Sequence, residues 1–279
     1  MQVHALTWNL FHGRDKPPDP ALFTWRSRLL RATERNATHV QVNRDLLTEF
    51  STILAGASWD IALLQECPPR WCEPLARAAD AEPHRVLTSR NLLRPLRAAI
   101  ARANPDLIAS NEGGSNLTLV RRSSPLAPSH PARELVLRPR FPERRTMAFT
   151  RTNAGLCVAN LHATSNRPDL TSGELLRAAD TAVSWAAGSP LLFGGDLNLR
   201  PAEHPDVFEA LGSRFGLAPP TGPKAIDHLL VRGLEIVDAP APWPPERREL
   251  SEDGLALRLS DHAPVEATFR FAKPEAGVR

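Results

Sequence analysis

The stretch PLLFGGDLNLRP, residues 190–201, places an apolar run directly before two glycines, an aspartate and an asparagine. Such a run is typical of a buried β-strand. Gly194 and Gly195 permit a close approach of two backbones, or dihedral angles that other residues avoid. Asp196 and Asn198 are two positions apart, so in extended backbone their side chains point to the same side. The stretch therefore predicts a strand that ends by presenting two polar groups to one cavity.

Seven further apolar segments are predicted as strands, and several of them also end in polar side chains. Helical patterns lie between the strands, at residues 43–56, 71–80, 91–103 and 173–187. Because strands outnumber helices and the helices fall between them, we expect an α/β fold of two sheets covered by helices rather than one doubly wound sheet. The further strands are predicted at residues 3–10, 59–66, 115–122, 144–151, 155–162, 225–233 and 263–271.

The composition describes a globular chain of 279 residues, because 42% of the residues are hydrophobic and 23% are charged. We expect a single domain over residues 1–279. The irregular segments 13–36 and 239–250 have predicted strands on both sides, so neither is expected to be a linker.

The net charge of +3 is compatible with a polyanionic substrate but is no evidence for one. The three cysteines are too few, and odd in number, for a disulfide framework. No signal peptide and no apolar run long enough to cross a bilayer are visible. These features together favour a reducing, cytoplasmic compartment. The oligomeric state is left open.

Polar residues stand at the ends of the predicted strands, where open α/β sheets build their sites. Hydrolysis of a phosphate ester needs a hard cation, an activated water and hydrogen-bond donors for the phosphoryl oxygens. Mg²⁺ prefers oxygen ligands. Glu66, with Asp261 and the amide oxygen of Asn9, fits a site for Mg²⁺, with Mn²⁺ as the alternative ion.

The remaining polar residues suit the other parts of this chemistry. A histidine paired with an aspartate has a raised pKa and is a good donor to a phosphoryl oxygen. His262 with Asp227 is the predicted pair. The Asp196 carboxylate is predicted to orient or deprotonate the attacking water.

These segments resemble the endonuclease/exonuclease/phosphatase superfamily, whose motifs occur here in that family's order and span residues 7–264. The resemblance implies a four-layer α/β sandwich of two packed mixed sheets flanked by helices. It places the site in a cleft at one edge of the sheets and implies a divalent metal, usually Mg²⁺. The matching segments are TWNL (7–10), LLQE (63–66), NLH (160–162), GGDLN (194–198), IDH (226–228) and LSDHAP (259–264).

The resemblance also implies roles for single residues. Glu66 matches the family's metal-binding glutamate, and Asn9 matches an asparagine that helps the metal site. Asp261 matches the aspartate of the terminal Asp-His pair, and we assign it to the metal. Asp196 and Asn198 match the pair that positions the water and binds the phosphate.

His262 matches the histidine of the terminal pair, with Asp227 orienting it. His162 matches a second histidine that serves as an acid toward the leaving group. Asn116, in GGSNLTLVRR, corresponds to a phosphate-contacting asparagine, and Asn160 is assigned to substrate binding with it.

Three departures disfavour a dedicated abasic-site repair nuclease. The chain has no tyrosine to place near the phosphate. Phe11 occupies a position where those nucleases carry a second carboxylate, and His162 supplies a histidine that they lack. The longer motifs of the inositol phosphatase branch are also absent from the sequence.

A metal-dependent phosphoesterase that acts on phosphodiesters is therefore the preferred hypothesis. Nucleic acid is the first expected substrate, because residues 26–35 and 89–103 are rich in arginine, although both segments also fit ordinary solvated helix faces. A phospholipid or phosphoinositide head group is the second. A catalytically retired module that binds phosphorylated ligands is the alternative from another class. Loops 13–43 and 239–250 carry no pattern that reveals specificity.

Five more residues near these motifs have alternative interpretations. His12 is a stronger candidate for the site than His4. His228 should face away from the cleft, because it alternates with Asp227. Arg144 or Arg145 is placed to reach the cleft.

Overall fold

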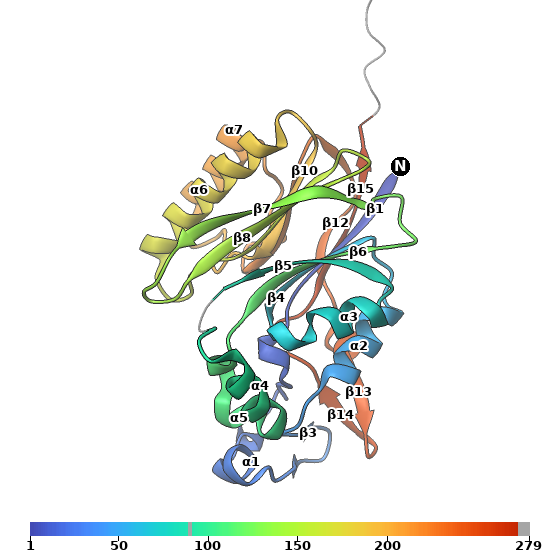
Figure 1. Cartoon of the computed structure of the whole chain (residues 1–279), viewed down its shortest axis with the longest axis vertical. Coiled ribbons are helices and arrows are strands. Elements are labelled where there is room, and N and C mark those ends of the chain that lie inside the picture. The colour runs from blue at the N-terminus through green and yellow to red at the C-terminus, as the bar shows by residue number, and fades with distance from the viewer. Residues whose placement is uncertain (89–90, 273–279) are drawn as a thin grey trace, which may run out of the picture.

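Two β-sheets form the centre of the computed structural model, which describes residues 1–88 and 91–272 (Figure 1). The first sheet has the strand order β12 (Leu234–Pro242), β15 (Val265–Phe271), β1 (Gln2–Asn9), β4 (Ile61–Cys67), β6 (Ser115–Arg121) and β5 (Ala81–Leu87). The second has the order β11 (Asp227–Arg232), β10 (Leu191–Asp196), β9 (Cys157–His162), β8 (Arg145–Thr152) and β7 (Pro128–Arg138). Two small pairs complete the strands: β2 (Glu34–Arg35) with β3 (Val40–Gln41), and β13 (Glu249–Glu252) with β14 (Leu255–Arg258).

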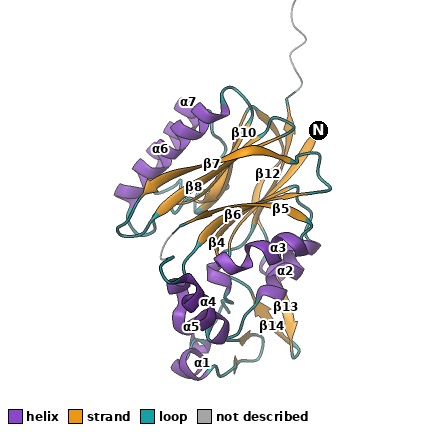
Figure 2. Ribbon diagram, viewed as in Figure 1, coloured by secondary structure: helices purple, strands orange, loops and turns teal. Residues whose placement is uncertain are grey.

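Helices cover the outer faces of both sheets, so the molecule has four layers (Figure 2). Helices α2 (Leu47–Gly56) and α3 (Cys72–Ala78) share an apolar core with β1, β4 and β6 of the first sheet. Helices α6 (Pro168–Ala186) and α7 (Pro205–Phe215) share another with β8, β9 and β10 of the second. A third core joins the inner faces of the two sheets. The expectation of a four-layer α/β sandwich is confirmed.

Three more helices lie together at one end of the molecule: α1 (Trp25–Leu30), α4 (Arg94–Ala103) and α5 (Pro105–Ile108). The 3₁₀ turns are η1 (Phe11–Gly13), η2 (Pro20–Leu22), η3 (Pro69–Trp71), η4 (Ala109–Glu112) and η5 (Pro245–Arg248). No described helix is both long enough and apolar enough to cross a membrane.

Strand pairing brings the polar strand ends to one edge. Strand β1 runs parallel to β4, and β9 runs parallel to β10. Asp196 at the end of β10 lies opposite His162 of β9 and opposite Asp227 of the antiparallel strand β11. Because β1 and β4 also contact β10 and β9 across the two sheets, their carboxyl ends share this edge with Asn9 and Glu66.

All eight strands and four helices predicted from the sequence are present, with shifts of a few residues at their ends. The sequence interpretation missed β5, β7, β12 and α7, and the short elements α5, β2, β3, β13 and β14. Segment 13–36 was predicted to be irregular, but it contains η2, α1 and β2. Segment 239–250 was predicted to be irregular, but it holds the end of β12, η5 and the start of the β13–β14 hairpin. Strand β12 lies at the edge of its sheet, and an edge strand tolerates prolines such as Pro240 and Pro242 because it needs fewer ladder hydrogen bonds.

The two glycines of the opening stretch are required by close backbone contact, as predicted. A Cβ at Gly195 would lie 1.9 Å from the carbonyl oxygen of Leu161, and one at Gly194 would lie 2.5 Å from that of His228. Gly195 also has a φ of +128°, which other residues rarely adopt. The glycines therefore let β9, β10 and β11 reach the site edge in their observed register.

Substituting Gly195→Ala is expected to destabilise the fold by about 3 kcal/mol or more, because both the clash with Leu161 and the positive φ oppose a side chain. Gly173→Ala is the matched control, because a Cβ there meets no atom within 4 Å and the residue lies inside helix α6. That variant should be unchanged or about 0.5–1 kcal/mol more stable. Urea unfolding measures both, and equal stabilities would contradict the assigned role of Gly195.

Candidate active site

Asp196 lies at the centre of the polar groups that the strand ends bring together. Its carboxylate is buried and accepts a hydrogen bond from Asn9 Nδ2 at 2.9 Å, which connects the two sheets. The Nε2 atoms of His162 and His262 lie 3.5 and 3.9 Å from Asp196 Oδ2. Burial, with the nearby charge of Asp227, raises the pKa of Asp196 to about 7. The group is therefore poised to exchange a proton near neutral pH.

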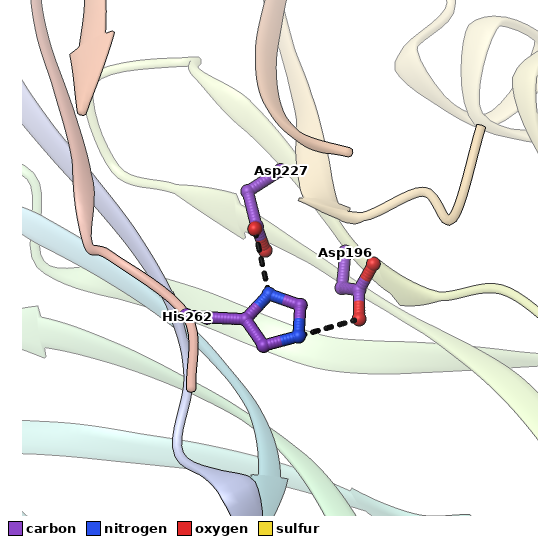
Figure 3. A group of neighbouring side chains, drawn as sticks. All are labelled: Asp196, Asp227 and His262. Carbon is purple, nitrogen blue, oxygen red and sulfur yellow. Dashed lines mark hydrogen bonds and ion pairs between the residues drawn. The ribbon is translucent and has the colours of Figure 1, made fainter. Parts of the chain in front are cut away.

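His262 and Asp227 form the ion pair that the sequence predicts (Figure 3). Nδ1 of His262 lies 2.7 Å from Asp227 Oδ2, and since a carboxylate only accepts hydrogen bonds, Nδ1 carries a proton. Burial alone lowers the pKa of His262, but Asp227 and Asp196 overcome it and raise that pKa to about 10. His262 is thus a partly buried cation whose Nε2 faces Asp196.

Hydrogen bonds fix the loop that carries His262. Ser260 donates to the carbonyl oxygen of Asn9 at 2.6 Å and accepts from the His262 backbone at 3.1 Å. Trp8 Nε1 donates to the His262 carbonyl at 3.1 Å, and Arg248 donates to carbonyls of the same loop. The loop before β15 is therefore attached to the end of β1, which sets the position of His262 relative to Asp196.

Glu66 occupies a bulge near the end of β4. The pairing of β4 with β6 shifts between Leu64 and Cys67, and Glu66 has a φ of +48°. Its carboxylate is partly exposed, with Oε2 3.2 Å from His12 Nε2 and Oε1 3.9 Å from His162 Nε2. Burial, followed by the like charge of Asp261, raises the pKa of Glu66 to about 7. The bulge therefore turns Glu66 toward the cleft.

His12 contacts Glu66 more closely than the sequence analysis suggested. It lies in η1, where Phe11 and His12 both have positive φ, so the chain turns sharply just after Asn9. Burial, together with Arg14, lowers the pKa of His12 to about 3, so it is neutral. The nearest sequence signal was its position three residues after Asn9, which indicates proximity but no orientation.

His162 is held by Arg145, which was one of two arginines expected to reach the cleft. The guanidinium NH1 lies 3.2 Å from His162 Nδ1. Arginine only donates, so Nδ1 accepts and the ring proton lies on Nε2, toward Asp196 and Glu66. Burial and the charge of Arg145 lower the pKa of His162 well below its usual value. His162 is therefore a neutral donor in this arrangement, whereas Arg144 is half-exposed near Glu134.

Asn198 lies beyond the end of β10, so the alternation expected for an extended strand does not apply to it. Its φ is +54°, its backbone N–H donates to Asp196 Oδ1 at 3.1 Å, and its side chain donates to the carbonyl oxygen of Ala163 at 3.0 Å. Asn198 thereby orients Asp196 through its backbone rather than by a parallel side chain.

The two asparagines predicted to bind substrate lie deeper in the protein than the residues around Asp196. Asn160 is fully buried between the sheets, where it accepts from Gln65 at 2.9 Å and donates to Thr118 at 3.3 Å. Asn116 is also buried and donates to the carbonyl oxygen of Thr146 at 2.8 Å. Its Oδ1 has no donor among the described residues, whereas the amide of Asn160 is occupied within the protein.

His228 faces away from the site, as the alternation with Asp227 predicts. It is fully buried, packs against Phe208 with ring centroids 5.0 Å apart, and accepts from the Thr221 backbone at 3.1 Å. It belongs to the support of β11 and not to the polar cluster.

Two sets of residues could hold a cation. Asp196, Asp227 and His262 bring one ligand atom each within 4.8 Å of one another. However, the ion pair already uses the proton on His262 Nδ1, and the cationic ring has no lone pair to offer. Glu66 and Asp261 instead offer carboxylate oxygens, and their repulsion is what a divalent cation would relieve. The second set fits a hard cation better.

The ion pair predicts a pH-dependent contribution to stability. The pKa of His262 rises from 6.5 to about 10 on folding, so this stabilisation is complete below pH 6.5 and is lost as the pH rises toward 10. Asp227→Asn should lower the free energy of unfolding by about 3 kcal/mol at pH 6, and by progressively less at higher pH. Chemical denaturation across this pH range measures the difference.

The control places the same Asp227→Asn substitution in a His262→Gln background. There the loss of the difference between pH 8 and pH 10 should disappear, because the partner that titrates in this range is gone. Only a variation near pH 7 should remain, since Asp227 also acts on Asp196. A pH-independent difference in the original background would show that the two residues do not interact as the geometry indicates.

Comparisons with known proteins agree with the observed fold. The model of the Endonuclease/Exonuclease/phosphatase family matches residues 6–262. An endonuclease/exonuclease/phosphatase family protein from Bacteroides thetaiotaomicron has a similar fold, with a TM-score of 0.63, 12% identity and coverage of 98% of this chain and 99% of that one. No curated protein sequence matches the chain.

Two further solved structures share the fold. A mannosyl-6-phosphatase from Bacteroides thetaiotaomicron has a TM-score of 0.63 at 12% identity, with coverage of 96% of this chain and 100% of the other. TDP2 from C. elegans has a TM-score of 0.57 at 17% identity, with coverage of 96% and 75%. At such identities the structures show the fold alone, but the family model covers nearly the whole sequence, and the chain therefore belongs to the Endonuclease/Exonuclease/phosphatase family.

Proposed function

We propose that the protein hydrolyses phosphate esters, with phosphodiesters preferred, by in-line attack of water in the presence of a divalent cation. The observation that carries this proposal is the environment of Asp196. One buried carboxylate with a pKa of about 7 lies between the neutral His162 and the cationic His262. A proton acceptor and two hydrogen-bond donors thus converge on one place, which suits attack of water on a phosphoryl group.

The cation would be held by Glu66 and Asp261, with Asn9 beside them. Mg²⁺ or Mn²⁺ bound there supplies positive charge that polarises the phosphoryl group. The residues fit it because carboxylate oxygens suit a hard cation, and because the pKa of Glu66 is raised by burial and by Asp261. Asn9 Oδ1 accepts from the Phe11 backbone at 2.9 Å and keeps a second lone pair.

The remaining residues act on the water and the substrate. Asp196 orients the attacking water and accepts its proton. His262 donates from Nε2 to a phosphoryl oxygen and stays protonated because Asp227 pairs with Nδ1. His162 donates from Nε2 toward the leaving oxygen as a neutral hydrogen-bond donor, with Arg145 fixing the tautomer.

A pocket beside the ion pair offers room for one substituent of the phosphate. It has a volume of about 530 Å³, and Asp261 and His262 form one wall. Lys224 contributes a cation, and Ile226, Pro242 and Val265 contribute apolar surface. This lining suits an ester with a partly apolar group. Nucleic acid and phospholipid head groups are the two candidate substrate classes within this chemistry, and exposed leucines among the arginines of α1 and α4 favour the second.

The catalytic proposal predicts that Asp196→Ala and His262→Ala each lower kcat by about a thousandfold or more, because each removes a group that acts in the transition state. The assay offers plasmid DNA, single-stranded RNA, an aryl phosphodiester and a short-chain phospholipid, with Mg²⁺, with Mn²⁺ and with EDTA. Asp180→Ala, which removes an exposed carboxylate from α6, is the control and should keep full activity. Unchanged kcat in either site variant would refute the assignment.

The cation proposal predicts a rise in Tm of about 5 °C with saturating Mg²⁺ or Mn²⁺ and no rise with EDTA present. Glu66→Gln should lose most of this rise, whereas Glu203→Gln, at an exposed ion pair with Arg200, should keep it. Differential scanning calorimetry gives the answer independently of any substrate. A metal-dependent Tm without hydrolysis of any phosphate ester would favour the retired binding module instead.

A further inference from the structure

Exposed apolar side chains gather on α1, α4 and α5 and on the turn before α4. Thirteen large apolar side chains are exposed among the described residues, and eight of them lie at 25–30 or 92–107. Leu92 is 72% exposed, and Trp25 and Leu30 are each 66% exposed. Single exposed apolar residues are ordinary, but a concentration of them marks an interaction surface. The eight are Trp25, Leu29, Leu30, Leu92, Leu93, Leu96, Ile100 and Leu107.

The segments that contain α1 and α4 are strongly cationic. Residues 24–33 and 91–104 contain six arginines and no aspartate or glutamate. In a chain with 34 basic and 31 acidic residues, so complete a separation of charge gives this end of the molecule a positive surface. The arginines are Arg26, Arg28, Arg31, Arg94, Arg97 and Arg102.

The three helices form one surface next to the site. Helix α5 packs against both α1 and α4, and all three lie at the end of the molecule away from the N-terminus (Figure 1). Turn η4, which follows α5, packs against η1, where His12 contacts Glu66. Arg14 and Arg28 line a pocket of about 330 Å³ beside α1, and Arg14 interacts electrostatically with Glu66 and Asp261.

We propose that helices α1, α4 and α5 dock the protein on membranes that contain anionic lipids. Leucines and a tryptophan interleaved with arginines are typical of helices that lie in the membrane interface. The one acidic residue of α1, α4 and α5 is Asp106 of α5, which is buried. The apolar side chains enter the boundary between head groups and acyl chains, and the arginines bind the anionic head groups. Docking by this surface brings the catalytic cleft close to the lipid phosphates.

The exposed leucines favour a membrane over nucleic acid as the partner of this surface. Binding to nucleic acid accounts for the arginines, since phosphate contacts need cations and single-stranded bases stack on aromatic side chains. It does not account for seven exposed aliphatic side chains beside one aromatic residue, Trp25. Burial of each leucine in a lipid interface is favourable, and in water the same exposure is a cost. The surface therefore fits a lipid partner better than a polynucleotide.

The test is flotation of the full chain with vesicles of phosphatidylcholine alone or mixed with phosphatidylserine. The wild type should bind the mixed vesicles much more strongly, and added salt should weaken that binding. Leu30→Glu combined with Leu96→Glu should lower the partition coefficient at least about tenfold, because two apolar contacts are lost and two negative charges are gained. The variant should keep its Tm and its rate on a soluble aryl phosphodiester, so docking is tested separately from catalysis.

The matched control is Ile236→Glu combined with Val237→Glu, which makes the same change at exposed residues of β12 and should bind like the wild type. If the leucine double variant has a lower Tm, Leu92→Glu alone, in the turn before α4, replaces it.

Three results would overturn the proposal. One is equal binding to neutral and mixed vesicles. Another is vesicle binding that the leucine substitutions leave unchanged. The third is the absence of vesicle binding. In that case, a dimer seen by sedimentation would assign the leucines to a contact between two copies of the chain. Binding of DNA or RNA that the leucine substitutions leave unchanged would assign the arginines to nucleic acid.

Discussion

The site depends on the close approach of the two sheets at the carboxyl ends of β1, β4, β9 and β10. The apolar core between the sheets holds them together, and the hydrogen bond from Asn9 to Asp196 connects them at the edge. Gly195 permits β9 and β10 to lie at their observed close distance, because a side chain at Gly195 would collide with Leu161. If the strands moved apart by even one side-chain width, the groups of the site would no longer meet.

That approach has an electrostatic consequence. His262 lies 3.9 Å from Asp196, and His162 lies 3.9 Å from Glu66, in a largely buried place. The charges of Asp196, Glu66 and His262 therefore interact with little screening by water. Burial raises the pKa of both carboxyl groups, and Asp227 keeps His262 cationic against the same effect. Groups that would be inert at a surface therefore change proton affinity in the range where hydrolytic chemistry operates. Weak screening by water makes the polar cluster costly to bury, and the same weak screening shifts the pKa values that suit the cluster to function.

The cleft alone does not specify which phosphate ester the protein binds, and the helices at the end of the molecule bear on that choice. The cleft favours a class of reaction, since a carboxylate and donors around a phosphoryl group serve many esters. In the proposed function, surfaces beside the cleft would select among these esters. They are a partly apolar pocket next to His262 and the leucines and arginines on α1, α4 and α5. The proposed catalysis and the proposed docking thus use separate residues of one fold, joined through η1 and Arg14.

The sequence by itself determined the strands that end at or next to Asn9, Glu66, His162 and Asp196, because apolar runs, glycines and short motifs are local signals. It also indicated that His262 pairs with Asp227 and that the His228 side chain points away from the cleft. Only the tertiary structure decided that His12 lies beside Glu66, that Arg145 fixes the tautomer of His162, and that Asn160 connects the sheets instead of lining the cleft. Those positions result from backbone turns with positive φ and from the packing of two sheets, which depend on contacts between residues far apart in the chain.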